Sequence, residues 1–153
     1  MQVTQVMATD VATCGPDANL AHVAKMMWDR DCGFVPVVDA AGKVVGVITD
    51  RDICIAAATR RLAPEGIVAS EAMRRPPIHT TQPGDTIEKV LATMKQFQVR
   101  RLPVVGPDGT LKGVISMNDI VLSSQQKQGP APADIVSALS AVCAHRRPKT
   151  AAA

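Results

Sequence analysis

Residues 46–53, with the sequence GVITDRDI, and residues 113–120, with the sequence GVISMNDI, share one pattern. Each contains a glycine, two apolar residues, a hydroxyl residue and, three positions after the hydroxyl, an aspartate. The apolar part is typical of a short buried strand. A hydroxyl followed three positions later by an acid is typical of a helix start. The pattern therefore predicts a strand-to-helix junction that occurs twice in the chain.

The two stretches belong to a longer internal repeat. A shift of 67 positions superimposes them and extends the match toward the N-terminus. Thirteen of the 43 positions from 11 to 53 are then identical without a gap, including Thr13 with Thr80 and Pro-Val-Val at 36–38 with 103–105. An ungapped register of this length indicates two copies of one structural unit.

Each copy has the same order of predicted elements. A short extended piece comes first, followed by a helix with apolar residues at helical spacing. Two short apolar strands joined by a glycine-containing loop come next, and a second helix begins near Asp50 or Met117. The predicted extended pieces are 11–14 and 78–81, and the predicted strands are 34–38, 44–49, 101–105 and 111–116. The fold class is α/β (α+β), with two βαββα units packed in pseudo-two-fold symmetry, because one copy alone cannot bury both faces of so small a sheet.

The repeat also divides the chain. We expect a first unit at 1–66, a second unit at 67–125, and a spacer with a C-terminal amphipathic helix and a basic tail at 126–153. Residues 60–76 lie outside the repeat and link the two copies. The apolar face of the last helix is predicted to contain Ile135, Val136, Leu139, Val142 and Cys143. We expect this helix to cover an apolar patch on the body or on a second subunit.

Composition excludes several classes of function. Of the 153 residues, 46% are hydrophobic and 2% aromatic, which argues for an aliphatic core and against base stacking on single-stranded nucleic acid. The net charge of +3 comes from the last thirty residues, and a neutral body argues against duplex DNA as a partner. No apolar run is long enough for a membrane span, and the N-terminus does not resemble a signal peptide. We therefore expect a cytoplasmic protein whose four cysteines are reduced.

The repeated hydroxyl and aspartate allow two interpretations. In the first they only cap a helix, because they satisfy free backbone N–H groups at its start. In the second the same side chains also accept hydrogen bonds from ribose hydroxyls, while nearby arginines face phosphates. Such arginines are present, since Arg51 lies inside the first motif and Arg100 and Arg101 precede the third strand.

The two units together resemble tandem CBS domains, which form a Bateman module. The resemblance is carried by a Thr-x-x-Pro start, a Pro-Val-Val strand, a Gly-Val-Ile strand and a [Thr/Ser]-x-x-Asp-Ile end, in that order and twice, over about residues 5–125. Within that family the chain is similar to stand-alone bacterial proteins with two CBS units. The resemblance implies a regulatory module that binds an adenosine-containing ligand in the cleft between the copies and pairs into a homodimer. The resemblance implies no obligatory cofactor. The candidate ligands that it implies are AMP, ADP, ATP, S-adenosylmethionine and NAD.

The resemblance also implies which residues form the ligand sites, each built from both units. One site uses Ser116, Asp119 and Arg101, with Thr13, Cys32 and Phe34 around the base. The other uses Thr49 and Asp52, with Thr80, Val99 and Arg100 nearby, and Arg51 lies in the same motif. The second site has no arginine that matches Arg101, because Phe34 stands at that position. The two sites are therefore expected to differ.

Catalysis is not predicted. His22, His79 and His145 are scattered, and no phosphate-binding glycine loop or metal-ligand spacing occurs. One alternative is a thiol-based or metal-linked stress-response protein, since Cys14, Cys32 and Cys54 all lie in the first copy. Another alternative is a dimeric adaptor in which the nucleotide sites are not functional and the motifs are only caps. The regulated protein partner is not identified by the sequence.

Overall fold

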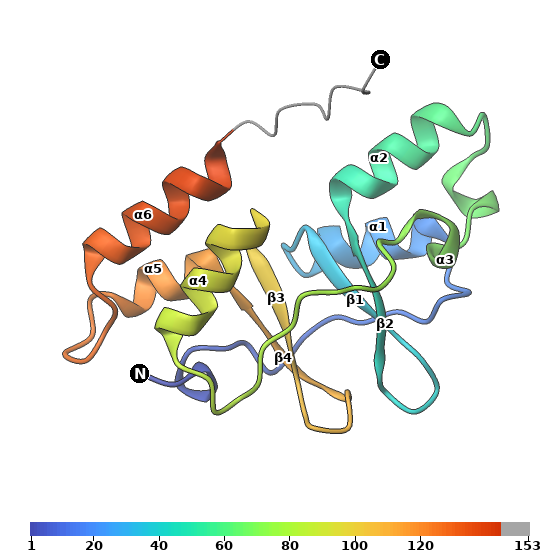
Figure 1. Cartoon of the computed structure of the whole chain (residues 1–153). Helices are drawn as coiled ribbons and strands as arrows, with labels where there is room; N and C mark the ends of the chain where they lie inside the picture. Colours follow the sequence, from blue (N-terminus) through green and yellow to red (C-terminus); the bar gives the residue numbers. More distant parts are fainter. Residues whose placement is uncertain (145–153) are drawn as a thin grey trace, which may run out of the picture.

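The computed structural model describes residues 1–144 (Figure 1). The predicted basic tail, with Arg146, Arg147 and Lys149, lies outside the described residues. The helices and strands of the repeat follow the predicted order in both halves: α1 (Leu20–Asp29), β1 (Phe34–Val38), β2 (Val44–Thr49) and α2 (Asp50–Thr59), then α4 (Ile87–Phe97), β3 (Arg101–Val105), β4 (Leu111–Ser116) and α5 (Met117–Ser123). Outside the repeat are η1 (Val3–Gln5), η2 (Pro64–Gly66), α3 (Ala69–Ala72) and α6 (Pro132–Cys143). The predicted fold class is confirmed.

Each half contains a two-stranded antiparallel sheet made from one hairpin. Pairing of β1 with β2 and of β3 with β4 follows the same register, with an irregularity at Val37/Val38 and at Val104/Val105. The hairpin loops turn at Gly42 and Gly109, whose φ angles of +75° and +82° favour glycine because it has no Cβ. The predicted extended pieces are reduced to single parallel bridges, from Cys14 to Val37 and from Thr81 to Val104.

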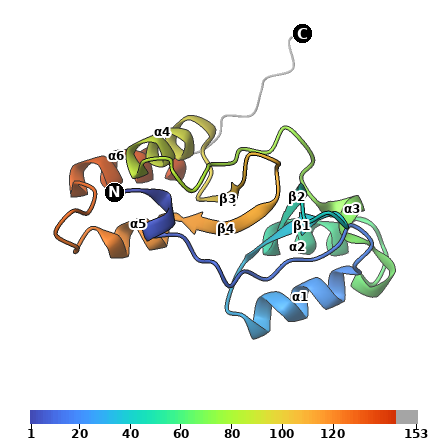
Figure 2. The ribbon, with the colours of Figure 1, turned by 90° about the horizontal axis from the view of Figure 1, so that it is seen from below.

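Segments that flank the repeat widen each sheet on its other side. Ala8 pairs with Val114 of β4, and Arg74 pairs with Val47 of β2. The N-terminal segment therefore joins the second half, and the segment before residue 75 joins the first half (Figure 2). Packing crosses the predicted division between residues 66 and 67, because Val3 lies in the core of the second half and Ile67 in the core of the first.

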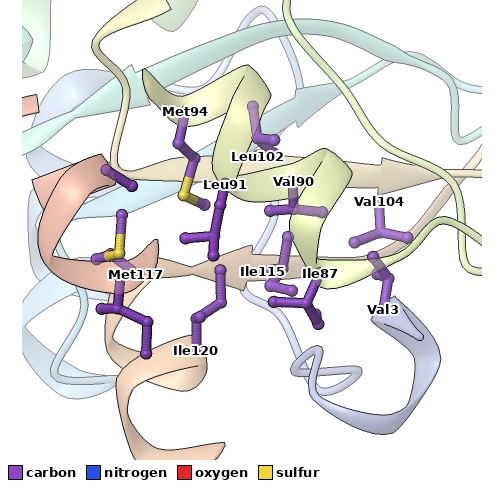
Figure 3. Close-up of a cluster of buried hydrophobic side chains, with 12 residues drawn as sticks. Val3, Ile87, Val90, Leu91, Met94, Leu102, Val104, Ile115, Met117 and Ile120 are labelled. Atoms are coloured by element: carbon purple, nitrogen blue, oxygen red, sulfur yellow. The ribbon is translucent and has the colours of Figure 1, made fainter. Parts of the chain in front are cut away.

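The two halves have separate apolar cores. In the second core the α4 residues Ile87, Val90, Leu91 and Met94 pack on β3 and β4, with Val3 at one end (Figure 3). Most of these side chains are fully buried, and each contributes about 1.5–3 kcal/mol relative to exposure. Helices α1 and α4 begin at side-chain caps, where Asn19 accepts from the His22 N–H and Thr86 from the Lys89 N–H.

Helix α6 lies along α4 and α5 and completes the second core (Figure 1). Ile135 and Ala138 are buried, and Leu139 and Val142 are partly buried against the core. Two predicted members of this face were wrong, since Val136 is 61% exposed and Cys143 is also exposed. Ile135 and Ala138 are three positions apart and share one side of the helix, whereas Val136 lies on another side.

The halves also meet at their hairpin loops. Lys43 and Thr110 form an antiparallel bridge, in which the Val44 N–H donates to the Gly109 carbonyl at 3.2 Å and the Leu111 N–H donates to the Gly42 carbonyl at 3.0 Å. Each strand-to-helix junction lies at the end of its hairpin opposite to this contact. This backbone bridge thus joins the two hairpins that carry the repeated motifs.

The glycine that opens each motif is required by the flanking segment. A Cβ on Gly113 would collide with the carbonyl oxygen of Ala8, and a Cβ on Gly46 would collide with the flexible side chain of Met73.

We expect Gly113→Ala to lower the free energy of unfolding by about 1–3 kcal/mol, because backbone must move, and Gly46→Ala to lower it less. Urea unfolding measures both. Gly84→Ala is the control, since no atom lies within 4 Å of its Cβ position; equal effects of all three would contradict the explanation.

Candidate functional site

The hydroxyl and aspartate of each motif are joined by the same three hydrogen bonds. Asp52 Oδ2 accepts from the Thr49 N–H at 3.0 Å and from Thr49 Oγ1 at 2.6 Å, and the Asp52 N–H donates to Thr49 Oγ1 at 3.2 Å. In the second motif the corresponding distances for Asp119 and Ser116 are 2.8, 2.6 and 3.2 Å. The capping function is therefore confirmed. It uses one carboxylate oxygen, Oδ2, of each aspartate.

The hairpin register sets one residue directly opposite each hydroxyl. Arg101 is the β3 partner of Ser116, and Phe34 is the β1 partner of Thr49. Both are half-buried. An arginine is thus the cross-strand neighbour of the second hydroxyl residue, where the first motif has a phenylalanine. This register supports the expectation that the two sites differ in charge.

The residues just before β3 are held by backbone contacts. The Arg100 carbonyl accepts from the Met117 N–H at 2.9 Å, while the Arg100 side chain is exposed. Val99 is partly buried against the second core. Arg51, on the first turn of α2, is exposed. Two of the predicted cations, Arg51 and Arg100, are therefore accessible to a ligand.

A stacked ring pair lies next to the predicted base-binding residues of the second copy. His79 immediately precedes Thr80, and its ring stacks on that of Phe97 with 3.5 Å between centroids. The following residue, Thr81, is buried and donates from its hydroxyl to Asp85. Burial raises the pKa of Asp85, but hydrogen bonds from Lys89, the Gln82 N–H and Thr81 outweigh burial and lower it overall. Sequence reasoning missed the ring pair, because its members are 18 positions apart and follow no repeated pattern.

The predicted base-binding residues of the first copy lie around its core. Cys32 is half-buried and packs against that core, and Thr13 is half-buried beside the bridge of Cys14 with β1. Cys32 also lines a cavity of about 500 Å³ between α1 and α2, together with Cys54 and Trp28. This cavity lies within the first half. The cross-unit grouping of Thr13, Cys32 and Phe34 with Ser116, and of Thr80, Val99 and Arg100 with Thr49, stays a prediction.

A further charged residue lies at the first motif. The Arg74 Nε is 3.6 Å from Asp52 Oδ1, the oxygen that the cap does not use. The repeat at a shift of 67 does not reveal Arg74, because the flanking segments match at a shift of 66, with Met7-Ala8 over Met73-Arg74. At that shift Met7 and Met73 are identical but Ala8 and Arg74 are not, so the sequence carries only a weak signal for Arg74.

Comparison with known proteins agrees with this architecture. The family model described as CBS domain matches residues 3–58 and again residues 68–125. The chain belongs to the CBS domain family. Its tandem CBS units are 34% identical over 119 residues to inosine-5'-monophosphate dehydrogenase of Mycobacterium tuberculosis, which covers 78% of this chain and 21% of that enzyme. The chain thus spans about a fifth of that relative's length. It is 30% identical over 137 residues to the uncharacterized protein YlbB of Bacillus subtilis, covering 88% of this chain and 90% of YlbB.

Solved structures of CBS pairs share the fold. Hypoxic Response Protein I, solved with two coordinated zinc ions, is 28% identical with a TM-score of 0.72, covering 80% of this chain and 98% of that chain. The CBS domain pair of MJ0100, solved with 5'-methylthioadenosine and S-adenosyl-L-methionine, has a TM-score of 0.72 at 24% identity, covering 80% and 94%. CBSX2 in complex with AMP has a TM-score of 0.70 at 21% identity, covering 82% and 96%. CBS-pair neighbours therefore include proteins solved with adenosine ligands.

Within residues 1–144, no group of three or more His, Cys, Asp or Glu side chains is placed to hold a metal ion. None of the helices in that range has the length and apolar character needed to cross a bilayer.

The environment of Cys14 bears on the thiol alternative. Burial raises the pKa of the Cys14 thiol to about 11, so at pH 8 roughly one in 10³ molecules carries the thiolate.

We expect Cys14 to be unreactive toward an aromatic disulfide reagent in the folded protein, while the exposed Cys54 and Cys143 react. Spectrophotometric thiol counting checks this. Cys54→Ser is expected to remove one reactive thiol per chain and Cys14→Ser none; a lower count in Cys14→Ser would contradict the assignment.

Proposed function

We propose that the chain is a cytoplasmic, non-catalytic regulatory module that binds an adenosine-containing ligand between its CBS units and signals by a conformational change. The observation that carries the proposal is the repeated arrangement at the motifs. In each, a half-buried aspartate uses one oxygen, Oδ2, for the helix cap, and the cap does not use the other oxygen, Oδ1. The neighbours solved with methylthioadenosine, S-adenosylmethionine or AMP support the ligand class.

The proposed contacts follow from the chemistry of these groups. The Oδ1 atoms of Asp52 and Asp119 would accept hydrogen bonds from ribose hydroxyls. Arg101 is the proposed phosphate-facing group at the site of Ser116, with Thr13, Cys32 and Phe34 around the base. At the site of Thr49, the proposed neighbours of the ligand are Thr80, Val99 and the cations Arg51 and Arg100, of which only Val99 is not exposed.

The proposed signal is a change in the relation between the units. The backbone bridge between the hairpin loops joins the halves at one end, and the motifs lie at the other end of each hairpin. A ligand that contacts both units would favour one relative position of the halves. The size of the change is limited by the difference in affinity of the ligand for the two states.

The first test is a thermal melt with AMP, ADP, ATP, S-adenosylmethionine or NAD at millimolar concentration. A ligand at 100 times its Kd stabilises the fold by about 2.7 kcal/mol, which is several degrees in Tm for a chain of this size. We expect a shift with at least one of them, and its reduction in Asp119→Ala and Asp52→Ala, because each variant removes a ribose acceptor.

A matched control separates ligand contact from helix capping. Thr86 caps α4 and lies outside the motifs, so Thr86→Ala loses a cap worth about 1 kcal/mol without losing a ribose acceptor. It is expected to lower the Tm but keep the ligand shift. No shift with any compound in the wild-type chain would contradict the proposed function and favour the adaptor whose motifs are only caps. A shift that appears only on thiol oxidation would favour the thiol alternative.

We also propose a homodimer that acts on a protein partner whose identity is not known. Helix α6 covers α4 and α5 of the second half, while α1 and α2 of the first half expose Trp28 at 84% and Ile55 at 49%. Large apolar side chains exposed on two neighbouring helices are typical of an interaction surface. They support pairing through α1 and α2.

Trp28→Glu tests this pairing. We expect the wild-type chain to elute as a dimer in size-exclusion chromatography with light scattering, and Trp28→Glu to be mostly monomeric, because a charge would be buried in the interface. Leu122→Glu is the control, since Leu122 is 70% exposed and lies on α5, outside α1 and α2. A monomeric wild-type chain, or a dimer unaffected by Trp28→Glu, would contradict the proposal.

A further inference from the structure

The two motif aspartates differ in what their free oxygen faces. Asp52 Oδ1 lies 3.6 Å from the Arg74 Nε, whereas Asp119 has no ion-pair partner within residues 1–144. The equivalent of Arg74 in the second half is Ala8. Both residues pair with the motif valine two positions before the hydroxyl, Arg74 with Val47 and Ala8 with Val114. One site therefore has a cation supplied by the segment between the units, and the other has a methyl group at that position.

The backbone of Arg74 is fixed, but its side chain is accessible. The Arg74 N–H donates to the Val47 carbonyl at 2.8 Å, and the Val47 N–H donates to the Arg74 carbonyl at 3.1 Å. The Arg74 side chain is 52% exposed, and that of Asp52 is 14% exposed. The guanidinium thus lies on the solvent side of the carboxylate. It can turn away into solvent, while Asp52 keeps the hydrogen bonds that its Oδ2 accepts from Thr49.

The ion pair is also weak enough to exchange. At 3.6 Å the two groups attract each other but do not make a short hydrogen bond. Because the guanidinium is half exposed, solvent weakens its attraction to the carboxylate. A phosphate offers a guanidinium two parallel hydrogen bonds and a higher charge than one carboxylate oxygen. A ribose hydroxyl that donates to Asp52 Oδ1 therefore competes with Arg74. A ligand that also carries a phosphate offers the Arg74 guanidinium a new partner.

We infer that Arg74 makes the Asp52 site selective for phosphorylated adenosyl ligands over uncharged or cationic ones. This inference rests on the proposed function. A phosphorylated ligand gains a guanidinium contact, while adenosine or S-adenosylmethionine displaces Arg74 from Asp52 without offering it a phosphate. Arg74 also adds a guanidinium to the site that has no arginine matching Arg101, since Phe34 stands at that position.

Calorimetric titration with AMP and with adenosine tests the inference. An Asp119→Ala background reports the Asp52 site alone. There we expect Arg74→Ala to weaken the binding of AMP by about 10- to 100-fold, as for loss of a charge-assisted hydrogen bond. We expect the affinity for adenosine to be unchanged or slightly higher. Arg74→Lys is expected to fall between, because lysine keeps the charge but not the paired donors. If Asp119→Ala is too unstable to titrate, Asp119→Asn keeps an acceptor for the cap.

Two matched variants control for general electrostatics. Arg75→Ala removes the same charge from the next residue, whose guanidinium donates to the Ser70 carbonyl at 2.8 Å and not to Asp52. It is expected to change AMP affinity less than threefold. Ala8→Arg in an Asp52→Ala background places an arginine at the equivalent position beside Asp119. It is expected to raise the preference of that site for AMP over adenosine.

The outcomes separate this inference from the proposed function. The inference would be overturned if Arg74→Ala and Arg75→Ala weakened AMP binding equally. It would also be overturned if Arg74→Ala weakened the binding of AMP and of adenosine equally. Both outcomes would leave the adenosine site in place. Binding of AMP only at the Asp119 site would do the same. No heat of binding with either compound to the wild-type chain would overturn the proposed function, and the inference with it.

Discussion

The fold depends on the close approach of a flanking segment to the glycine of each motif. At Gly113 the backbone of Ala8 occupies the space of a Cβ, and at Gly46 the side chain of Met73 does so. These contacts seat the N-terminal segment on the second sheet and the connecting segment on the first. Because each sheet has only two strands of its own, this added backbone satisfies an edge that would otherwise be open.

The same close contact brings residues of the flanking segments to the motifs. The residue after each methionine, Ala8 or Arg74, pairs with the strand that ends at the hydroxyl. Side chains from outside a unit's own repeat thereby reach its strand-to-helix junction. Two units of one origin can thus carry different charges at equivalent positions through a change in the flanking segment alone, without any change in the motif that caps the helix.

The caps and the proposed ligand contacts are compatible because a carboxylate has two oxygens. Oδ2 satisfies the backbone and hydroxyl of the residue before the helix, which holds the side chain in one orientation. Oδ1 is then directed by the same bonds. A capping role and a binding role are therefore not alternatives at these positions, and a binding group fixed by its own fold loses little freedom when a ligand arrives.

The sequence by itself determined the repeated unit, its strands, its helix starts and the capping pairs of Thr49 with Asp52 and Ser116 with Asp119, because these depend on residues close in the chain. It also predicted the difference between Phe34 and Arg101, since the repeat aligns them. Only the tertiary structure decided that Val3 belongs to the second core, that Arg74 faces Asp52 and that His79 stacks on Phe97. These contacts join segments that the 67-residue repeat does not relate, and burial of apolar surface between distant segments follows no local pattern.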